Sequence, residues 1–310
     1  MNKKVLSNFA LFLTALIWGV SFVAQKAGMD YVGAFSFNFA RSILGGISLI
    51  PLIFLVKMTT PDNRPKKLKH LQHWYLFKAG AFCGLALFTA MSLQQYSMIS
   101  ASAGKAGFIS ALYIIFVPLI SMFFGAKLEN KIKVSVGLAL VGLYLLCFKG
   151  GLTGFDMYDG LLLIGAFFYG VHILVVNHFS RHVNPVKMSC VQFFVVGLLS
   201  LPFMLMFENP VAANFVAAKT PILYAGILTC GVAYTLQIFG QKFTPPTIAS
   251  IILCMESVFA VVGGSLILHE TMTPREVWGC IFMIIAVVLS QIQMKNFKKG
   301  LTVCSQNNEE

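Results

Sequence analysis

The sequence predicts an all-α integral membrane protein with ten transmembrane helices, arranged as two inverted five-helix repeats. Three observations lead to this fold class. Hydrophobic residues make up 57% of the 310 positions and charged residues only 11%, with a mean hydropathy of +0.80. Charges are separated by apolar runs as long as a membrane span, and the two halves of the chain match at a slowly shrinking offset. A water-soluble globule with one apolar core is excluded.

The apolar runs give the individual helices. A helix needs about 20 apolar residues to cross the hydrocarbon core, so the chain divides at charges, at polar runs and at Gly, Pro, Asn and Asp clusters. Continuous apolar runs favour helices over a β-barrel, whose strands alternate. The ten predicted spans are residues 8–27, 35–56, 75–96, 101–125, 134–148, 160–179, 186–207, 221–241, 246–268 and 277–293.

The basic residues give an orientation. With the N-terminus inside, sixteen of the 23 Lys and Arg residues fall in inside regions, four in outside loops and three within spans. Basic residues are retained on the cytoplasmic side of a membrane. We therefore expect a multi-pass protein of the plasma or inner membrane with both termini in the cytoplasm. The net charge of +12 is spread over these loops, so it does not predict nucleic-acid binding.

Corresponding residues recur between the halves. At an offset of 151, Trp18 aligns with Tyr169 and Arg41 with Gln192; at 147, Gln94 aligns with Gln241. The offset falls to 143 and then to 142, where Gly137 aligns with Gly279. Because each repeat has an odd number of spans, the second enters the membrane in the opposite sense. Inverted repeats of this kind are typical of carriers that alternate between inward-open and outward-open forms.

Several strings resemble the EamA family of the drug/metabolite transporter superfamily. They are Ala15-Leu-Ile-Trp-Gly-Val-Ser-Phe-Val23, Arg41-Ser-Ile-Leu-Gly-Gly46, Ala233-Tyr-Thr-Leu-Gln237 and Glu256-Ser-Val-Phe259. The resemblance spans roughly residues 7–293. It implies that helices 1–4 and 6–9 surround a central cavity, that helices 5 and 10 pack outside, and that the protein moves a small metabolite or an amino acid, usually by export. Relatives commonly carry proline where Ser257 stands, so Pro118 is the candidate for a helix irregularity.

The same reasoning sets the domain organisation. We expect a first repeat over residues 1–150, a second over 151–295 and a polar cytoplasmic tail over 296–310. The seven cysteines lack Cys-x-x-Cys spacing, and His178 with His182 has no third ligand nearby, so neither a metal nor a disulfide framework is predicted. No cofactor is predicted. The expected partners are a small-molecule substrate and membrane lipid, and no oligomeric state is predicted.

Glu256 is the leading candidate site residue. It is the one acidic residue deep in a predicted span, about 15 Å from the cytoplasmic start of the ninth helix. A charge at this depth costs about 3 kcal/mol on insertion scales. Glu256 could line the cavity and exchange a proton with substrate binding, or it could form a permanent salt bridge to Lys105 or Arg41.

Each of the other candidates could instead have a purely structural role. Lys105 and Arg41 could face the cavity or extend outward to the membrane surface. The aromatic pair Trp18 and Tyr169 could line the cavity or fill space between helices. For the remaining candidates the alternative is hydrogen bonding between helices. These are Gln25, Gln94, Gln237 and His172, with Gln241 as a weaker one.

The predicted function is secondary-active transport of a small metabolite, an amino acid or related compound, by alternating access. Export is the expected direction, and Glu256 could either couple transport to protons or only contact the ligand. No Gly-x-x-x-x-Gly-Lys-Ser/Thr run is present, so ATP is not the expected driver. The alternatives are efflux of drugs or lipophilic cations, a channel, and a membrane-embedded enzyme, the last disfavoured because no acid, base or metal-binding groups cluster within a span.

Overall fold

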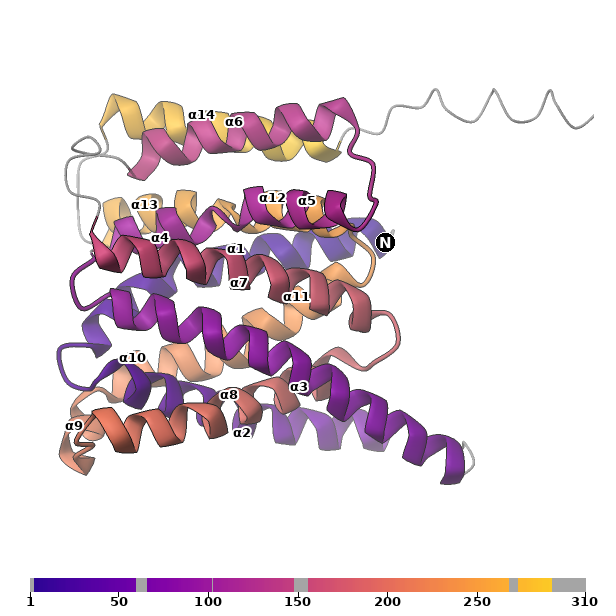
Figure 1. Cartoon of the computed structure of the whole chain (residues 1–310), viewed down its shortest axis with the longest axis vertical. Coiled ribbons are helices and arrows are strands. Elements are labelled where there is room, and N and C mark those ends of the chain that lie inside the picture. The colour runs from indigo at the N-terminus through magenta and orange to yellow at the C-terminus, as the bar shows by residue number, and fades with distance from the viewer. Residues whose placement is uncertain (1–2, 60–65, 102, 148–155, 268–272, 292–310) are drawn as a thin grey trace, which may run out of the picture.

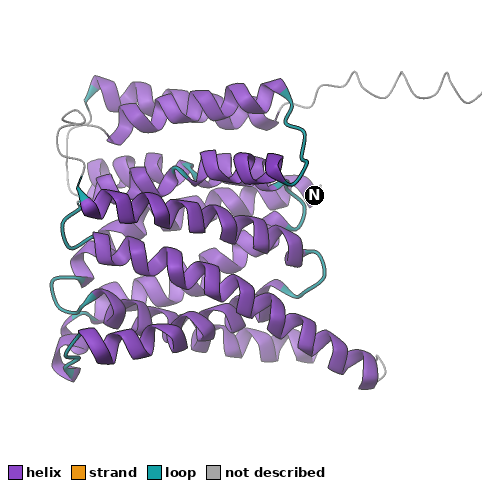
Figure 2. Ribbon diagram, in the orientation of Figure 1, coloured by secondary structure: helices purple, strands orange, loops and turns teal. Residues whose placement is uncertain are grey.

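The computed structural model describes residues 3–59, 66–101, 103–147, 156–267 and 273–291. Within these ranges the regular structure is helical throughout, with no strand (Figure 2). The predicted tail over 296–310 and Arg64, in the loop between the second and third predicted spans, lie outside the described residues. The elements in chain order are α1 (Lys3–Gly28), α2 (Ala34–Thr59), α3 (Lys66–Ser97), α4 (Ala103–Ala111), α5 (Tyr113–Phe123), α6 (Asn130–Cys147), α7 (Met157–Ser180), α8 (Pro185–Phe207), α9 (Ala212–Ala217), α10 (Lys219–Leu223), η1 (Tyr224–Ala233), α11 (Tyr234–Gln241), α12 (Pro246–Leu253), α13 (Met255–Ile267) and α14 (Pro274–Gln291).

Eight helices of the described chain are long and apolar enough to cross a membrane. They include Lys105–Phe123, which joins α4 and α5, and Lys219–Gln241, which joins α10, η1 and α11. The predicted fifth span is helical as α6, and the predicted ninth corresponds to α12 and α13, of which Pro246–Val262 is a shorter apolar helix. The protein is therefore an all-helical, multi-pass membrane protein.

The helices lie side by side in stacked layers (Figure 1). α6 and α14 pack against each other at one end of the molecule, and α2 packs on α8 at the opposite end. α1, α4, α5, α7, α12 and α13 lie between these two pairs. The separate position of α6 and α14 is the one that the family resemblance implies for helices 5 and 10.

Close helix contacts occur in matched pairs. A Cβ on Gly46 would lie 3.1 Å from Phe194, and a Cβ on Gly197 would lie 2.6 Å from Ile43, so exchanging each residue for its equivalent 151 positions away in the other half converts one contact into the other. A Cβ on Gly142 would lie 2.9 Å from the Gly279 carbonyl oxygen, and a Cβ on Gly279 would lie 2.9 Å from the Gly142 carbonyl oxygen. Gly137, which the sequence aligns with Gly279, has open space around it.

Two spans are interrupted in the middle. The predicted fourth breaks at Leu112, between α4 and α5, and the predicted ninth breaks at Cys254, between α12 and α13. In a continuous helix the Ile115 amide would bond to Ala111; here it bonds to the Leu112 carbonyl at 2.9 Å. The freed Ala111 carbonyl accepts from Cys254 Sγ at 3.3 Å. The two interruptions therefore support each other.

The cause of the irregularity differs from the one expected. Pro118 lies inside α5, six residues beyond the interruption of the fourth span, and the helix continues through it. The ninth span is broken although Ser257 stands at its proline position, and the Ser257 amide bonds to the Cys254 carbonyl at 3.1 Å. Contact between two frayed turns, not a proline, accompanies these breaks.

The predicted eighth span contains a ten-residue π-helix, η1. Wide helical turns of this kind are rare and occur frequently at functional sites. α1 crosses η1 and bonds to it at both ends: Tyr224 donates to the Ile17 carbonyl at 3.0 Å, and Thr14 donates to the Ala233 carbonyl at 3.1 Å. η1 and the start of α11 thereby face the middle of the bundle.

Candidate transport cavity

A small internal cavity lies where the central helices converge. Its volume is about 30 Å³, enough for about two water molecules. A metabolite therefore fits only if the helices move apart. Every lining residue is buried. The lining residues are Trp18, Ser21, Phe22 and Gln25 of α1, Arg41 of α2, Met91 and Gln94 of α3, Ser110 of α4, Tyr113 of α5, Tyr169 of α7, Thr229 of η1, Tyr234 of α11 and Glu256 of α13.

Glu256 lies in the first turn of α13, directly after the interruption at Cys254. Its side chain is 3% exposed, and its Oε1 accepts a hydrogen bond from the Tyr113 hydroxyl at 3.1 Å. No cationic side chain of the described residues forms an ion pair with it. The alternative of a salt bridge to Lys105 or Arg41 is therefore absent from this structure, and the carboxylate faces the cavity with a single hydroxyl partner.

Arg41 is the cation of the cavity. The guanidinium is 2% exposed, lies 5.3 Å over the Phe37 ring and donates from Nε to Asn38 Oδ1 at 2.9 Å. Asn38 is held in turn by its Nδ2, which donates to the Met91 carbonyl at 3.2 Å. The Nη2 atom has no hydrogen-bond partner among the described residues. Arg41 does not extend to the membrane surface.

One wall of the cavity is aromatic. The Trp18 indole packs against the Tyr234 ring with centroids 4.7 Å apart, and its Nε1 is buried without a partner in the described chain. Beside it, Thr229 donates to Ser21 Oγ at 3.0 Å and Gln25 Nε2 donates to the same atom at 3.2 Å. The Gln25 Oε1 atom has no partner there.

Another part of the lining is a chain of hydrogen bonds across three helices. Tyr169 of α7 donates to Gln94 Oε1 at 2.9 Å, and Gln94 Nε2 donates to Ser110 Oγ of α4 at 2.8 Å. Each amide atom of Gln94 thus has a partner, as buried polar groups require. Tyr169 and Gln94 serve packing and cavity lining together.

Four candidates from the sequence lie outside the cavity lining, among them Gln241, whose Nε2 donates to the Ile173 carbonyl at 3.0 Å. Lys105 Nζ lies 2.7 Å from Asp159 Oδ2, in a pair that joins α4 to the start of α7. The His172 ring lies behind the wall, 5.8 Å from the Tyr234 ring, and its Nε2 is 3.2 Å from Gln192 Oε1. Gln237 is buried on α11 with both amide atoms lacking a hydrogen bond within the described residues.

The sequence reasoning missed seven lining residues, and one of them had a detectable signal. Tyr113 and Glu256 are 143 positions apart, the same offset that pairs Phe116 with Phe259, so the repeat itself pairs the hydroxyl with the carboxylate. Thr229 and Tyr234 had no such signal, because their exposure to the cavity depends on η1. The other missed residues are Ser21, Phe22, Met91 and Ser110.

The cavity is therefore a polar site. Among the described residues, Trp18 Nε1 and Arg41 Nη2 are donors without a partner, Gln25 Oε1 is an acceptor without a partner, and Glu256 adds an acidic group. Buried polar atoms normally have partners. Three unpartnered atoms on residues that line one cavity indicate that a polar molecule, water or solute, completes their hydrogen bonds.

A bundle of membrane-crossing helices around a buried polar cavity defines the class of membrane transport proteins. Within that class, the chain belongs to the EamA-like transporter family, whose model matches residues 5–148 and again residues 157–291. The family model is thus present twice, once in each half of the chain. Six of the predicted site residues, Trp18, Gln25, Arg41, Gln94, Tyr169 and Glu256, line the cavity between the two halves.

The relatives of this chain include proteins named as transporters. An uncharacterized transporter of Archaeoglobus fulgidus is 30% identical, covering 94% of this chain and 88% of its own length. The uncharacterized inner membrane transporter YedA of Escherichia coli is 23% identical, covering 90% and 89%. A more distant relative, the probable terminal-alkyne amino-acid exporter of Streptantibioticus cattleyicolor, is 21% identical over 73% of each chain.

The fold has also been seen before. A crystal structure superimposes with a TM-score of 0.71, covers 92% of this chain and 96% of its own, and is 17% identical in sequence. At that identity the likeness concerns the fold alone.

Proposed function

We propose that the protein is a secondary-active carrier that exports a small polar metabolite, an amino acid or a related compound. The observation that carries this proposal is the central cavity, where an unpartnered guanidinium atom of Arg41 and the carboxylate of Glu256 line the same space. A zwitterion offers one group to each. The Streptantibioticus relative, named as a probable amino-acid exporter, supports an amino acid-like substrate.

Alternating access between two inverted five-helix repeats, with ten spans and both termini in the cytoplasm, is the proposed mechanism. The matched contacts support it. A Cβ on Gly19 would lie 2.8 Å from Phe259 Cβ, and a Cβ on Gly170 would lie 3.1 Å from Phe116 Cβ. Such equivalent seams between the repeats allow two closed forms of similar energy around one site. The proposed repeat boundary is residue 150, between the two family matches.

Proton coupling is proposed for Glu256. A carboxyl group at this depth is stable only when it is protonated or paired with a cation. Within the described chain, its hydrogen-bond partner is the Tyr113 hydroxyl. A substrate ammonium and a proton would therefore compete for the same oxygens. That competition exchanges one for the other across the membrane.

The experiment that tests transport begins with metabolite profiling. Cells that overexpress the protein and cells with an empty vector are compared in medium and cytosol, and the compound class that accumulates outside is reconstituted with the protein in liposomes. We expect saturable flux that unlabelled substrate in the opposite compartment stimulates several-fold. Flux that rises linearly with concentration and shows no such stimulation would point to a channel and contradict the carrier.

In the proposed orientation, packed side chains cover the end of the cavity that faces outside, which gives a second test. Phe22 of the cavity wall packs with Met98, Ile109 and Leu162 in one buried cluster, and the Lys105 pair with Asp159 joins α4 to α7 across the two repeats. Opening toward the outside must separate these helices.

Lys105→Met is expected to raise the labelling rate of a Ser21→Cys protein by an impermeant thiol reagent added outside. The expected rise is about fivefold, the factor for roughly 1 kcal/mol from a half-exposed ion pair. Lys131→Met is the matched control, because that lysine pairs with the exposed Glu129 at 2.8 Å. In the proposed topology this pair lies at the cytoplasmic end of the bundle. Equal rates in all three proteins would show that the Lys105 pair does not hold the outer side shut.

Efflux of lipophilic cations is the second candidate. The aromatic rings of Trp18, Tyr169 and Tyr234 favour it, since cations bind over ring faces. The buried charge of Arg41 on the same cavity opposes it, because it repels a cation that has no carboxylate of its own. The profiling experiment separates the two readings.

A further inference from the structure

A second hollow lies on the outside of the bundle, separate from the transport cavity. It is a groove of about 810 Å³ between α3, α5, α7 and α12. Its walls are mainly apolar. The lining residues are Phe82 of α3, Ile120 and Ser121 of α5, Phe124 and Ala126 just beyond α5, Phe167, Val171, Leu174, Val175, Asn177, His178 and Phe179 of α7, and Pro246 of α12.

The groove does not continue into the transport cavity. The backbone of α7 at Gly170 packs against α5, where a Cβ would lie 3.1 Å from Phe116 Cβ. The Phe116 ring meets the Phe167 ring edge-on with centroids 5.6 Å apart. Tyr169, on the cavity wall, and Val171, in the groove, thus lie on opposite sides of this contact. The groove follows the seam between the two family repeats, on the membrane side.

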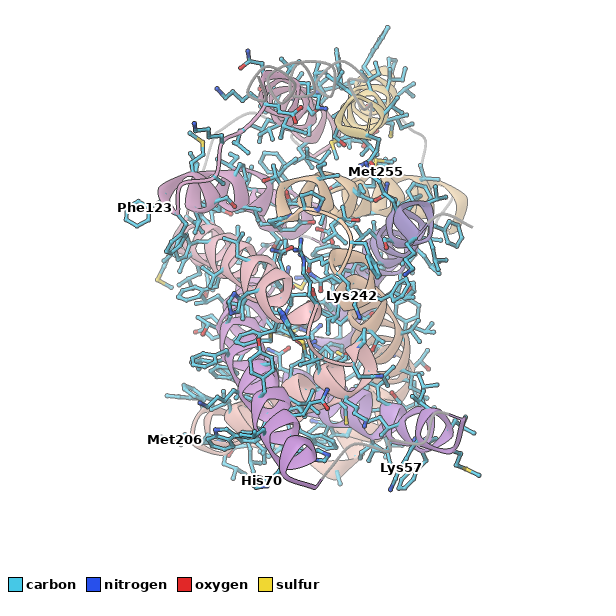
Figure 3. The ribbon with its side chains drawn as sticks, turned by 90° about the vertical axis from the view of Figure 1, so that its right-hand side faces the viewer. Lys57, His70, Phe123, Met206, Lys242 and Met255 are labelled. Atoms are coloured by element: carbon cyan, nitrogen blue, oxygen red, sulfur yellow. The ribbon has the colours of Figure 1, made fainter. Side chains whose placement is uncertain are left out.

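Two basic residues lie next to one end of the groove in the sequence. Lys127 directly follows the lining residue Ala126, and Arg181 caps α7 two residues after the lining residue Phe179; both are exposed. The nearest acidic residue in the sequence, Glu129, is paired with Lys131 at 2.8 Å. Figure 3 looks onto this end of the molecule, where Phe123 of α5 projects from the edge and Lys242 lies nearer the middle.

We infer that this groove binds one anionic phospholipid, with an acyl chain along the apolar walls and the phosphate at Lys127 and Arg181. The chemistry is complementary at both ends: apolar side chains match the hydrocarbon, and basic residues between membrane helices bind anionic headgroups. Asn177 Oδ1 is buried without a hydrogen-bond partner in the described chain, so a headgroup hydroxyl can donate to it. A lipophilic cation would meet the same rim with the wrong sign of charge.

The inference goes beyond the proposed function, because a lipid wedged between α5 and α7 would act on the seam and not on the cavity. It would hold α5 and α7 apart at this end, whereas at the other end the Lys105 pair joins α7 to α4, the other half of the same span. The occupancy of the groove would then bias which end of the carrier is open.

Native mass spectrometry of the full chain tests the inference. The protein is taken from vesicles of equal phosphatidylglycerol and phosphatidylcholine, and retained lipid is counted after graded delipidation. We expect one phosphatidylglycerol to be retained about tenfold over phosphatidylcholine. Leu174→Trp, which fills the groove, and the double variant Lys127→Gln/Arg181→Gln, which removes the rim charges, are each expected to abolish that preference.

The double variant Lys57→Gln/Lys219→Gln is the matched control. It removes the same charge from the end of α2 and the start of α10, so it should retain phosphatidylglycerol like the wild type. Because the four substituted charges are exposed, the test does not depend on the folding of Leu174→Trp. Equal retention of the two lipids by the wild type, or unchanged preference in Lys127→Gln/Arg181→Gln, would overturn the inference. Retention of tetraphenylphosphonium that Leu174→Trp abolishes would also overturn it, in favour of a hydrophobic cation.

Discussion

Replacing Glu256 by glutamine is expected to abolish proton-driven accumulation of substrate while the protein still inserts into the membrane. The amide keeps the size of the side chain and can still accept from Tyr113, which donates at 3.1 Å in the wild type. It cannot, however, exchange a proton or pair with an ammonium group. The expected loss is about 5- to 150-fold in the accumulation ratio, the range of ordinary coupling free energies.

The measurement is substrate flux into proteoliposomes with an imposed pH gradient, at matched protein content. Glu276→Gln is the control, because Glu276 is also a buried carboxylate but caps α14 by accepting from the Thr273 amide at 2.8 Å. It should transport like the wild type. If Glu256→Gln kept the wild-type accumulation and pH dependence, Glu256 would be a structural residue and the coupling proposal would fail.

The second large effect is expected at Gly19, where α1 crosses α13. A Cβ at this position would lie 2.6 Å from the Glu256 carbonyl oxygen and 2.9 Å from the Ala260 amide. Both atoms belong to the backbone and cannot rotate away. Gly19→Ala should therefore destabilise the folded protein by about 1 to 3 kcal/mol, the usual cost of overpacking, and should lower its unfolding temperature in detergent.

Gly137→Ala is the matched control for this substitution. Gly137 lies within α6 with nothing within 4 Å of its would-be Cβ, so alanine should be neutral or stabilising by up to about 1 kcal/mol through its helix propensity. Unfolding followed by a thiol-reactive dye that reports the buried cysteines measures both proteins. Equal midpoints for Gly19→Ala and Gly137→Ala would mean that the crossing relaxes without cost.

Much of this architecture could be read from the sequence because membrane helices obey simple length and charge rules. Spacing between charges located α2 and α8 to within a few residues, whereas α3 begins at Lys66, nine residues before the predicted third span. What the spacing could not reveal is broken or widened helices. η1 and the interruption at Cys254 depend on contacts with α1 and α4, which are distant in sequence. Pro118 was misleading because a helix can pass through a proline when neighbouring helices support it.

The candidate site was predicted in part, for a similar reason. Residues that break the apolar pattern, such as Arg41 and Glu256, stand out in a membrane helix, and both line the cavity. Lys105 stands out equally, yet it pairs with Asp159, an acidic residue near the end of a span whose role as its partner no local pattern indicates. Tyr234 is ordinary in sequence and becomes part of the site only through the geometry of η1.

The position of Trp18 makes the protein its own optical sensor. The chain has three tryptophans; Trp74 and Trp278 are 54% and 58% exposed on the outer surface of the bundle, whereas Trp18 is 8% exposed in the cavity wall. With phenylalanine at the two outer positions, the remaining indole emission would come from inside the cavity. Its wavelength and intensity would then follow solute entry and helix movement without any attached dye.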